Sequence, residues 1–102
     1  MGWVKIAQLS EIPVGQMLHV EVGMEDIGLF HTEDGLFATS DVCTHAAQQL
    51  TNGRLEGNIV SCPKHGGKFD VRTGEATAFP CYIPLQTYQT ELRGEEVWIH
   101  LD

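Results

Sequence analysis

The sequence predicts an all-β protein of antiparallel strands, and three observations support this fold class. Short apolar runs are separated by turn-forming residues throughout the chain. Several runs alternate apolar and polar residues, which is typical of a strand with one buried face. No apolar stripe with the helical period extends beyond two turns. The 102 residues are enough for one domain with a modest core, and we expect a single domain over residues 1–102.

The first half of the chain contains four expected strands joined by turns. Pro13 fixes its backbone and Gly15 permits a turn, so both mark the connection into the second strand. The Asp34-Gly35 pair favours a tight hairpin turn between the third and fourth strands. We expect a single helical turn at residues 46–50. The four strands are expected at residues 3–7, 17–22, 27–31 and 36–40.

The second half continues the same pattern. Residues 62–67 separate two expected strands and therefore lie at the tip of a hairpin. Residues 78–84 are bounded by prolines and are expected to form an irregular loop. The last two strands are expected to form a hairpin around Gly94. The four strands of this half are expected at residues 58–61, 68–71, 85–92 and 96–101.

Composition excludes some classes of function. Fourteen acidic and six basic residues give a formal net charge of -8, so nucleic acid is not an expected partner. No apolar run has the length of a membrane helix, and the N-terminus has no secretory signal pattern. Three cysteines cannot all pair, which favours a reducing compartment. We therefore expect a cytoplasmic protein that has no membrane partner. We also expect a monomer.

Two short stretches carry the chemistry. Cys43-Thr44-His45 and Cys62-Pro63-Lys64-His65 are sixteen residues apart, and each combines one thiol with one imidazole. Structural zinc sites usually group like ligands, two cysteines and then two histidines. A mixed pair in each loop suits a binuclear iron-sulfur cluster in which one iron takes both thiolates and the other takes both imidazoles. A single zinc ion is the alternative.

The extended pattern around these pairs resembles the Rieske [2Fe-2S] domain. The likeness includes Asp41-Val42 before the first pair, residues 55–57 between the pairs, residues 69–74 after the second pair, and Pro80. It covers essentially the whole chain. The resemblance implies the Rieske fold, in which stacked antiparallel β-sheets carry a cluster-binding subdomain of two hairpin loops at one tip.

The resemblance also implies the ligands of one [2Fe-2S] cluster. Cys43 and Cys62 correspond to the ligands of the buried iron, and His45 and His65 correspond to the ligands of the outer iron at the surface. Glycines follow the second pair, where backbone N-H groups would approach the cluster sulfurs. Cys81 matches no ligand and is expected to be a buried or half-buried free thiol.

Four positions indicate which Rieske proteins this chain does not resemble. Subunits of quinol-oxidising complexes carry an additional disulfide, and their cysteine positions hold Gln48 and Lys64 here. The same high-potential proteins place a serine and a tyrosine where this chain has Gly67 and Phe69. Both hydroxyls donate to sulfur and stabilise the reduced cluster. Their absence predicts a potential near the lower end of the Rieske range of roughly -150 to +300 mV.

The resemblance is closest to ferredoxins of multicomponent aromatic ring-hydroxylating dioxygenases. It implies a low-potential one-electron carrier between two partners, an NAD(P)H-dependent flavoprotein reductase and a terminal oxygenase. The chain is not expected to be an enzyme, because His19, His31 and His100 lie in separate strands and do not suggest a mononuclear iron triad. The alternatives are a component of a diiron monooxygenase and the small subunit of a nitrite-reductase-like enzyme.

Overall fold

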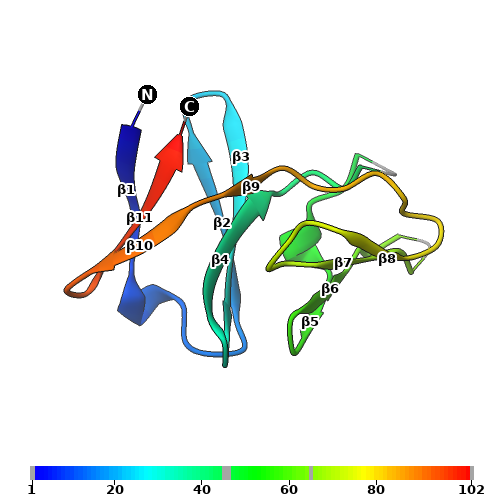
Figure 1. Cartoon of the computed structure of the whole chain (residues 1–102), viewed down its shortest axis with the longest axis horizontal. Helices are drawn as coiled ribbons and strands as arrows, with labels where there is room; N and C mark the ends of the chain where they lie inside the picture. The colour runs from blue at the N-terminus through cyan, green and yellow to red at the C-terminus, as the bar shows by residue number, and fades with distance from the viewer. Residues whose placement is uncertain (1, 45–46, 65, 102) are drawn as a thin grey trace.

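The computed structural model describes residues 2–44, 47–64 and 66–101. In these ranges the chain forms antiparallel strands and two short 3-10 helices, and the strands assemble into three sheets (Figure 1). The predicted all-β fold of stacked antiparallel sheets is confirmed. Neither 3-10 helix approaches the length needed to cross a bilayer, and no candidate membrane span occurs in these ranges.

The three sheets are built from different parts of the chain. The first has the order β1-β11-β10 and consists of β1 (Gly2–Gln8), β11 (Glu96–Leu101) and β10 (Thr90–Arg93). The second runs through β2 (Met17–Val22), β3 (Glu25–Thr32), β4 (Gly35–Ser40) and β9 (Thr87–Tyr88). The third runs through β5 (Arg54–Glu56), β6 (Ile59–Ser61), β7 (Lys68–Asp70) and β8 (Ala76–Ala78). The 3-10 helices are η1 (Leu9–Glu11) and η2 (Leu50–Asn52).

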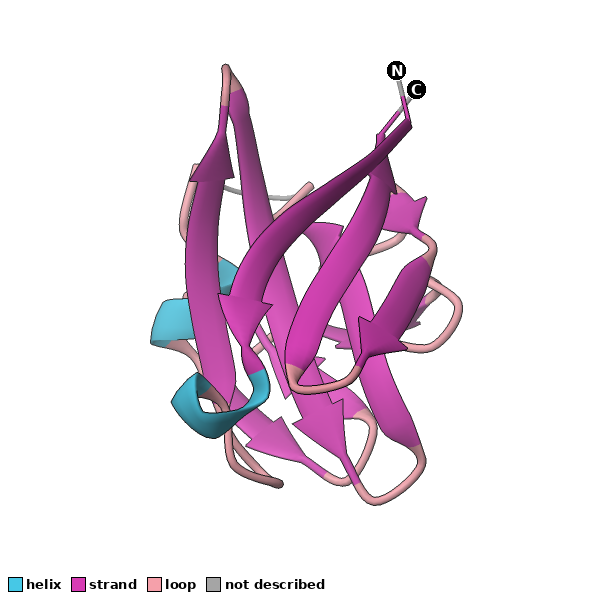
Figure 2. Ribbon diagram, turned by 90° about the vertical axis from the view of Figure 1, so that its left-hand side faces the viewer, coloured by secondary structure: helices cyan, strands magenta, loops and turns pink. Residues whose placement is uncertain are grey.

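Two hydrophobic cores hold these sheets together. The basal core lies between the first and second sheets, and the tip core lies beneath the third sheet and its loops. Figure 2 shows that strands make up most of the chain and that helix is confined to short turns. The third sheet is at one end of the long axis, away from both termini (Figure 1). The basal core consists of Ala7, Ile12, Ile27, Leu29, Ala38, Val97 and Ile99. The tip core consists of Phe30, Cys43, Leu50, Val60, Cys62, Phe69, Val71, Cys81 and Leu85.

Strand β3 contributes to both cores. Its central residues, Ile27 to Phe30, are all buried, because this part of the strand is covered on both faces. Side chains alternate between the faces of a strand, so Ile27 and Leu29 enter the basal core while Phe30 enters the tip core. One continuous strand therefore ties the position of the tip to the base.

The helical turn predicted at residues 46–50 is wrong for residues 47–49, and only Leu50, the first residue of η2, is helical in the described part of that range. Val42 forms a bridge with Gln49, and the Cys43 N-H donates to the Gln48 carbonyl over 2.9 Å. Residues 48 and 49 are thus held in an extended pairing across the loop. The first helical hydrogen bonds come later, in η2, which begins at Leu50.

The single strand predicted at residues 85–92 is divided in the structure. Its first part, β9, pairs with β4 of the second sheet, and its second part, β10, pairs with β11 of the first sheet. Gln89 lies between them, and its carbonyl accepts a hydrogen bond of 3.0 Å from the His100 N-H. The chain changes sheets at this residue. Two short strands, β5 and β8, were not predicted.

Replacing Phe30 by alanine tests the joint role of β3. The wholly buried ring faces the tip core, so the variant should lose about 3–5 kcal/mol of unfolding free energy, measured by urea denaturation. Met24→Ala is the control, because Met24 is 98% exposed and its loss should change stability by less than about 0.5 kcal/mol. Equal stability of the two variants would contradict the packing described for β3.

Candidate metal centre

The first cysteine loop begins at the end of a strand and closes on itself. β4 ends at Ser40. The backbone hydrogen bond from the Cys43 N-H to the Gln48 carbonyl spans the loop next to the Val42–Gln49 bridge. Cys43 is only 3% exposed, so its sulfur faces the tip core. The loop therefore presents a thiol to the inside of the molecule.

The second cysteine loop is the connection between β6 and β7, as the sequence predicts. The Cys62 N-H donates to the Gly67 carbonyl over 2.7 Å, which closes the loop directly above the paired strands. Cys62 is also 3% exposed. Both predicted cysteine ligands are consequently buried members of one core, although they are nineteen residues apart in the sequence.

A third loop, residues 79–84, follows β8 and packs against the first. Its Cys81 is 5% exposed, and its Sγ lies 3.8 Å from the Sγ of Cys43. The Thr44 hydroxyl donates to the Ile83 carbonyl over 2.7 Å, and the Cys81 N-H donates to the Ala78 carbonyl over 3.1 Å. Cys81 is therefore a buried thiol, as expected. Its sulfur contacts the sulfur of Cys43 within the tip core.

In the absence of a bound metal, burial favours the protonated form of the Cys62 and Cys81 thiols. Burial, with the neighbouring Cys43 as the next cause, raises the pKa of the Cys62 thiol and raises that of Cys81 to about 12. Thiolates at this place need a compensating positive charge, which a bound iron supplies. Buried, closely spaced thiols without a disulfide between them are the donor set of a metal-sulfur centre, so Cys43 and Cys62 fit the predicted cluster.

The histidines divide into two groups. The predicted ligands His45 and His65 lie outside the residues that the structure describes. The other three lie in separate strands, as predicted. The His31 Nδ1-H donates to the Ile12 carbonyl over 2.7 Å, and the His100 ring packs edge-on against Trp3 with 5.3 Å between centroids. His19 has a more specific role.

Asp41 belongs to the pattern that resembles the family, but the sequence reasoning missed its structural role. It is fully buried two positions before Cys43, and its carboxylate accepts hydrogen bonds from His19 Nδ1 at 2.6 Å, the Thr51 N-H at 2.9 Å and the Thr51 hydroxyl at 2.7 Å. Gly28 lies opposite His19 in β3, and a Cβ there would come within 3.0 Å of Asp41 Oδ1. Asp41 thus anchors both ends of the first cysteine loop to β2 and β3.

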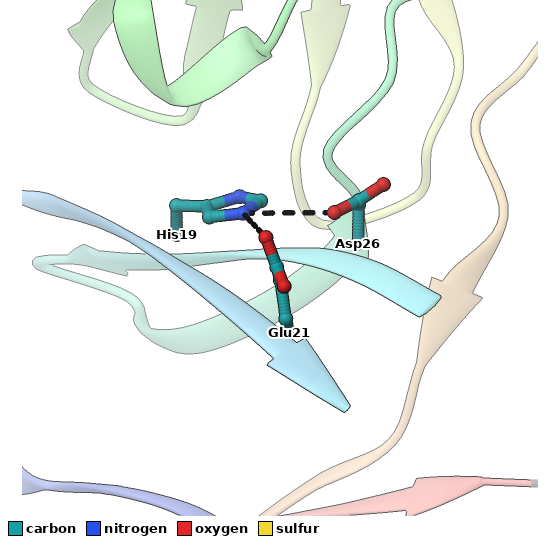
Figure 3. Close-up of side chains that lie close together, drawn as sticks. All are labelled: His19, Glu21 and Asp26. Atoms are coloured by element: carbon teal, nitrogen blue, oxygen red, sulfur yellow. Dashed lines mark ion pairs between the residues drawn. The ribbon is translucent and has the colours of Figure 1, made fainter. Parts of the chain in front are cut away.

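The outer side of His19 faces two further carboxylates (Figure 3). His19 and Glu21 lie on the same face of β2, and Asp26 pairs with Glu21 across the strands. His19 Nε2 is 3.5 Å from Glu21 Oε2 and 3.6 Å from Asp26 Oδ1. Burial by itself lowers the pKa of His19, but the hydrogen bonds to Asp41 and Glu21 and the nearby charges outweigh it and raise that pKa above 6.5.

Gly67 has a steric reason to be glycine. It is buried, and a Cβ built on it would lie 2.2 Å from the Cys81 sulfur and 3.2 Å from the Cys81 Cβ. No side chain fits at residue 67 while Cys81 is in place. High-potential Rieske proteins have a serine at this position, and here the Cys81 sulfur occupies the space that the serine side chain would need. A serine therefore cannot be introduced at residue 67 unless Cys81 is also replaced.

Comparison with known proteins agrees with this geometry. Residues 2–89 match the model of the Rieske [2Fe-2S] domain. The chain is 39% identical over its full length to the biphenyl 2,3-dioxygenase ferredoxin component of Rhodococcus jostii (strain RHA1), covering 95% of that protein. The chain belongs to the Rieske [2Fe-2S] family, and its cofactor is one Rieske-type [2Fe-2S] cluster.

Solved structures give the same result. The ferredoxin of carbazole 1,9a-dioxygenase from Nocardioides aromaticivorans IC177 superposes with a TM-score of 0.94 at 30% identity, with 100% of each chain covered. A chain from a complex of reduced oxygenase and oxidised ferredoxin in carbazole 1,9a-dioxygenase superposes with a TM-score of 0.90 at 34% identity, covering 96% of this chain and 92% of that one. The predicted Rieske fold is confirmed.

The close approach of Gly67 and Cys81 predicts that a substitution at residue 81 suppresses the effect of a substitution at residue 67. Gly67→Ala should lower cluster content, measured as visible absorbance per chain, because the new methyl group collides with the Cys81 sulfur. The double variant Gly67→Ala/Cys81→Ala should recover most of that content, since its closest contact is the remaining 3.2 Å to Cβ. If the double variant is as depleted as the single one, the steric account is wrong.

The raised pKa of His19 predicts a pH-dependent contribution to stability. A raised folded-state pKa stabilises the protein fully below the ordinary value of 6.5, and the stabilisation is lost as pH rises through the folded-state pKa. The stability advantage of the wild type over His19→Gln, measured by urea denaturation, should therefore be larger at about pH 5.5 than at about pH 8.5. An advantage that grows with pH would contradict the arrangement of carboxylates around His19.

Proposed function

We propose that this chain is the ferredoxin component of an aromatic ring-hydroxylating dioxygenase system, a low-potential carrier of single electrons. One observation carries the proposal. Two buried cysteines meet at the closed tip of a Rieske fold, in a chain that aligns over its whole length with ferredoxin components of such systems. The relatives include proteins named for biphenyl and for carbazole, so the class of system is proposed and a particular aromatic compound is not.

We assign Cys43 and Cys62 as ligands of the inner iron and His45 and His65 as ligands of the outer iron. When bound, the cluster accepts and releases one electron. The chain's own contribution is to hold the ligand loops and keep water from the thiolates. Cys43 and Cys62 are each 3% exposed and are fixed by the backbone hydrogen bonds that close their loops.

The residues around the thiolates support a low potential. Phe69 is wholly buried in the tip core and offers no hydroxyl, and Gly67 offers no side chain at all. Potentials of Rieske clusters depend on hydrogen bonds to sulfur and on solvent exposure. A cluster without these two donors suits a carrier that receives electrons from a flavoprotein reductase.

The loop beside Cys81 has the properties of a docking surface. Phe79 is 89% exposed, Tyr82 is 79% exposed and Ile83 is 48% exposed, although all three are large and apolar. Exposed aromatic side chains are enriched at protein interfaces. A partner that covers this loop lies close to the buried sulfurs, since Cys81 is part of the same loop. We propose the terminal oxygenase as that partner, and a related ferredoxin has been solved with its oxygenase.

Reconstitution tests the function. The purified holoprotein is added to a flavoprotein reductase and a ring-hydroxylating oxygenase, and NADH-driven formation of the dihydroxylated product is measured. Product should form in proportion to the added protein and only when all three components are present. Transfer to a diiron monooxygenase or a nitrite reductase, without transfer to any ring-hydroxylating oxygenase, would replace the proposal by one of those alternatives. The reductase, the monomeric state and the cytoplasmic location stay predictions.

Phe79→Ala tests the docking surface. The side chain is almost fully exposed, so its loss should leave the cluster spectrum and midpoint potential unchanged. It should raise the oxygenase concentration needed for half-maximal electron transfer by about five- to thirtyfold, as expected for an aromatic interface residue worth about 1–2 kcal/mol. Met24→Ala is the matched control, because it removes an equally exposed apolar side chain from the turn between β2 and β3. Equal effects of both variants would exclude the loop as the docking site.

A further inference from the structure

We propose that the Cys81 thiol donates a hydrogen bond to the sulfur of Cys43 and thereby raises the midpoint potential of the cluster. The inference rests on the proposed function, since it takes Cys43 to be an iron ligand. It gives Cys81 a specific role as a positioning and tuning residue that does not itself bind iron. The sequence alone assigns this cysteine no role.

Distance and burial place the two sulfurs in contact. Their separation of 3.8 Å suits a hydrogen bond between sulfur atoms, and both residues are at most 5% exposed. Water therefore does not compete for the ligand sulfur on this side.

The chemistry of ligation fixes the direction of the hydrogen bond. An iron ligand is a thiolate and carries no proton. Cys43 is therefore the acceptor, and Cys81, which is not in the ligand set, is the donor. The hydrogen bond lowers the electron density at Cys43 and so stabilises the more negative, reduced cluster more than the oxidised one.

The fold holds the donor in place on two sides. The Cys81 N-H is bound to the Ala78 carbonyl at 3.1 Å, and the Thr44 hydroxyl ties the same loop to the first cysteine loop at 2.7 Å. On the other side Gly67 leaves the space that the Cys81 sulfur fills, because a Cβ at residue 67 would lie 2.2 Å from it. Gly67 of the second cysteine loop and Cys81 of the third loop thus fit together sterically beside the proposed ligand Cys43.

The test compares midpoint potentials of the holoprotein and three variants by protein-film voltammetry. Cys81→Ala removes the donor and should lower the potential, so that the ratio of reduced to oxidised protein at a fixed applied potential falls about two- to fivefold. Cys81→Ser keeps a donor and should give a smaller decrease. Leu85→Val is the packing control, because it trims another buried side chain of the tip core without removing a proton donor, and its potential should not change.

A second readout is spectroscopic and begins with the wild type. The iron-to-cysteine stretching bands of the wild type, followed by resonance Raman spectroscopy, should shift when H2O is replaced by D2O. That shift should be smaller in Cys81→Ala, in which only backbone amides exchange. An absent exchange shift in the wild type overturns the inference, whether or not Cys81→Ala holds the cluster.

The outcomes separate this inference from the proposed function. A wild type without a Rieske spectrum sinks the proposed function and this inference together. A wild type with that spectrum, and a Cys81→Ala variant with full cluster content and an unchanged or higher potential, overturns only the role of Cys81. A decrease of similar size in Leu85→Val would attribute the effect to loosened packing and would also overturn it.

Discussion

The contact of the Cys81 sulfur with Cys43 on one side and Gly67 on the other is the constraint on which the tip depends. It joins three loops that come from distant parts of the chain, and each loop reaches the contact through its own backbone hydrogen bonds. Because these sulfurs are buried, they also form part of the hydrophobic core that supports them. The metal centre and the core of this end of the molecule are therefore one structure.

The base of the molecule fixes the tip in two ways. Strand β3 is buried on both faces and sends alternate side chains into the two cores. Asp41 adds a polar link, since its buried carboxylate joins His19 of β2 to Thr51 on the far side of the first cysteine loop. A buried carboxylate with three hydrogen bonds is costly to displace, so the loop has a defined position relative to the sheets. This rigidity is useful to an electron carrier, whose ligands must change little between oxidation states.

Local sequence patterns predicted most strands and the position of the second cysteine loop at a hairpin tip. They did so because alternation and turn residues reflect local backbone preferences. The links between loops were not predictable in this way. Asp41 is 22 residues from His19, and no local rule pairs a residue at a strand end with one in the middle of another strand. The sheet change at Gln89 was missed for the same reason, because it depends on which strands compete for pairing.

The candidate metal centre likewise has features that the sequence predicted and contacts that it did not. Spacing and residue type indicated Cys43 and Cys62 as ligands, and the structure buries both in one core. The role of Cys81 depends on its distance to Cys43, which the sequence does not contain. The histidine half of the site is tested most directly by pulsed electron-nuclear double resonance on the reduced protein labelled with 15N-histidine. The account predicts hyperfine coupling to two histidine nitrogens, one from His45 and one from His65. A reduced protein with no histidine coupling, or a colourless protein that binds zinc, would contradict it.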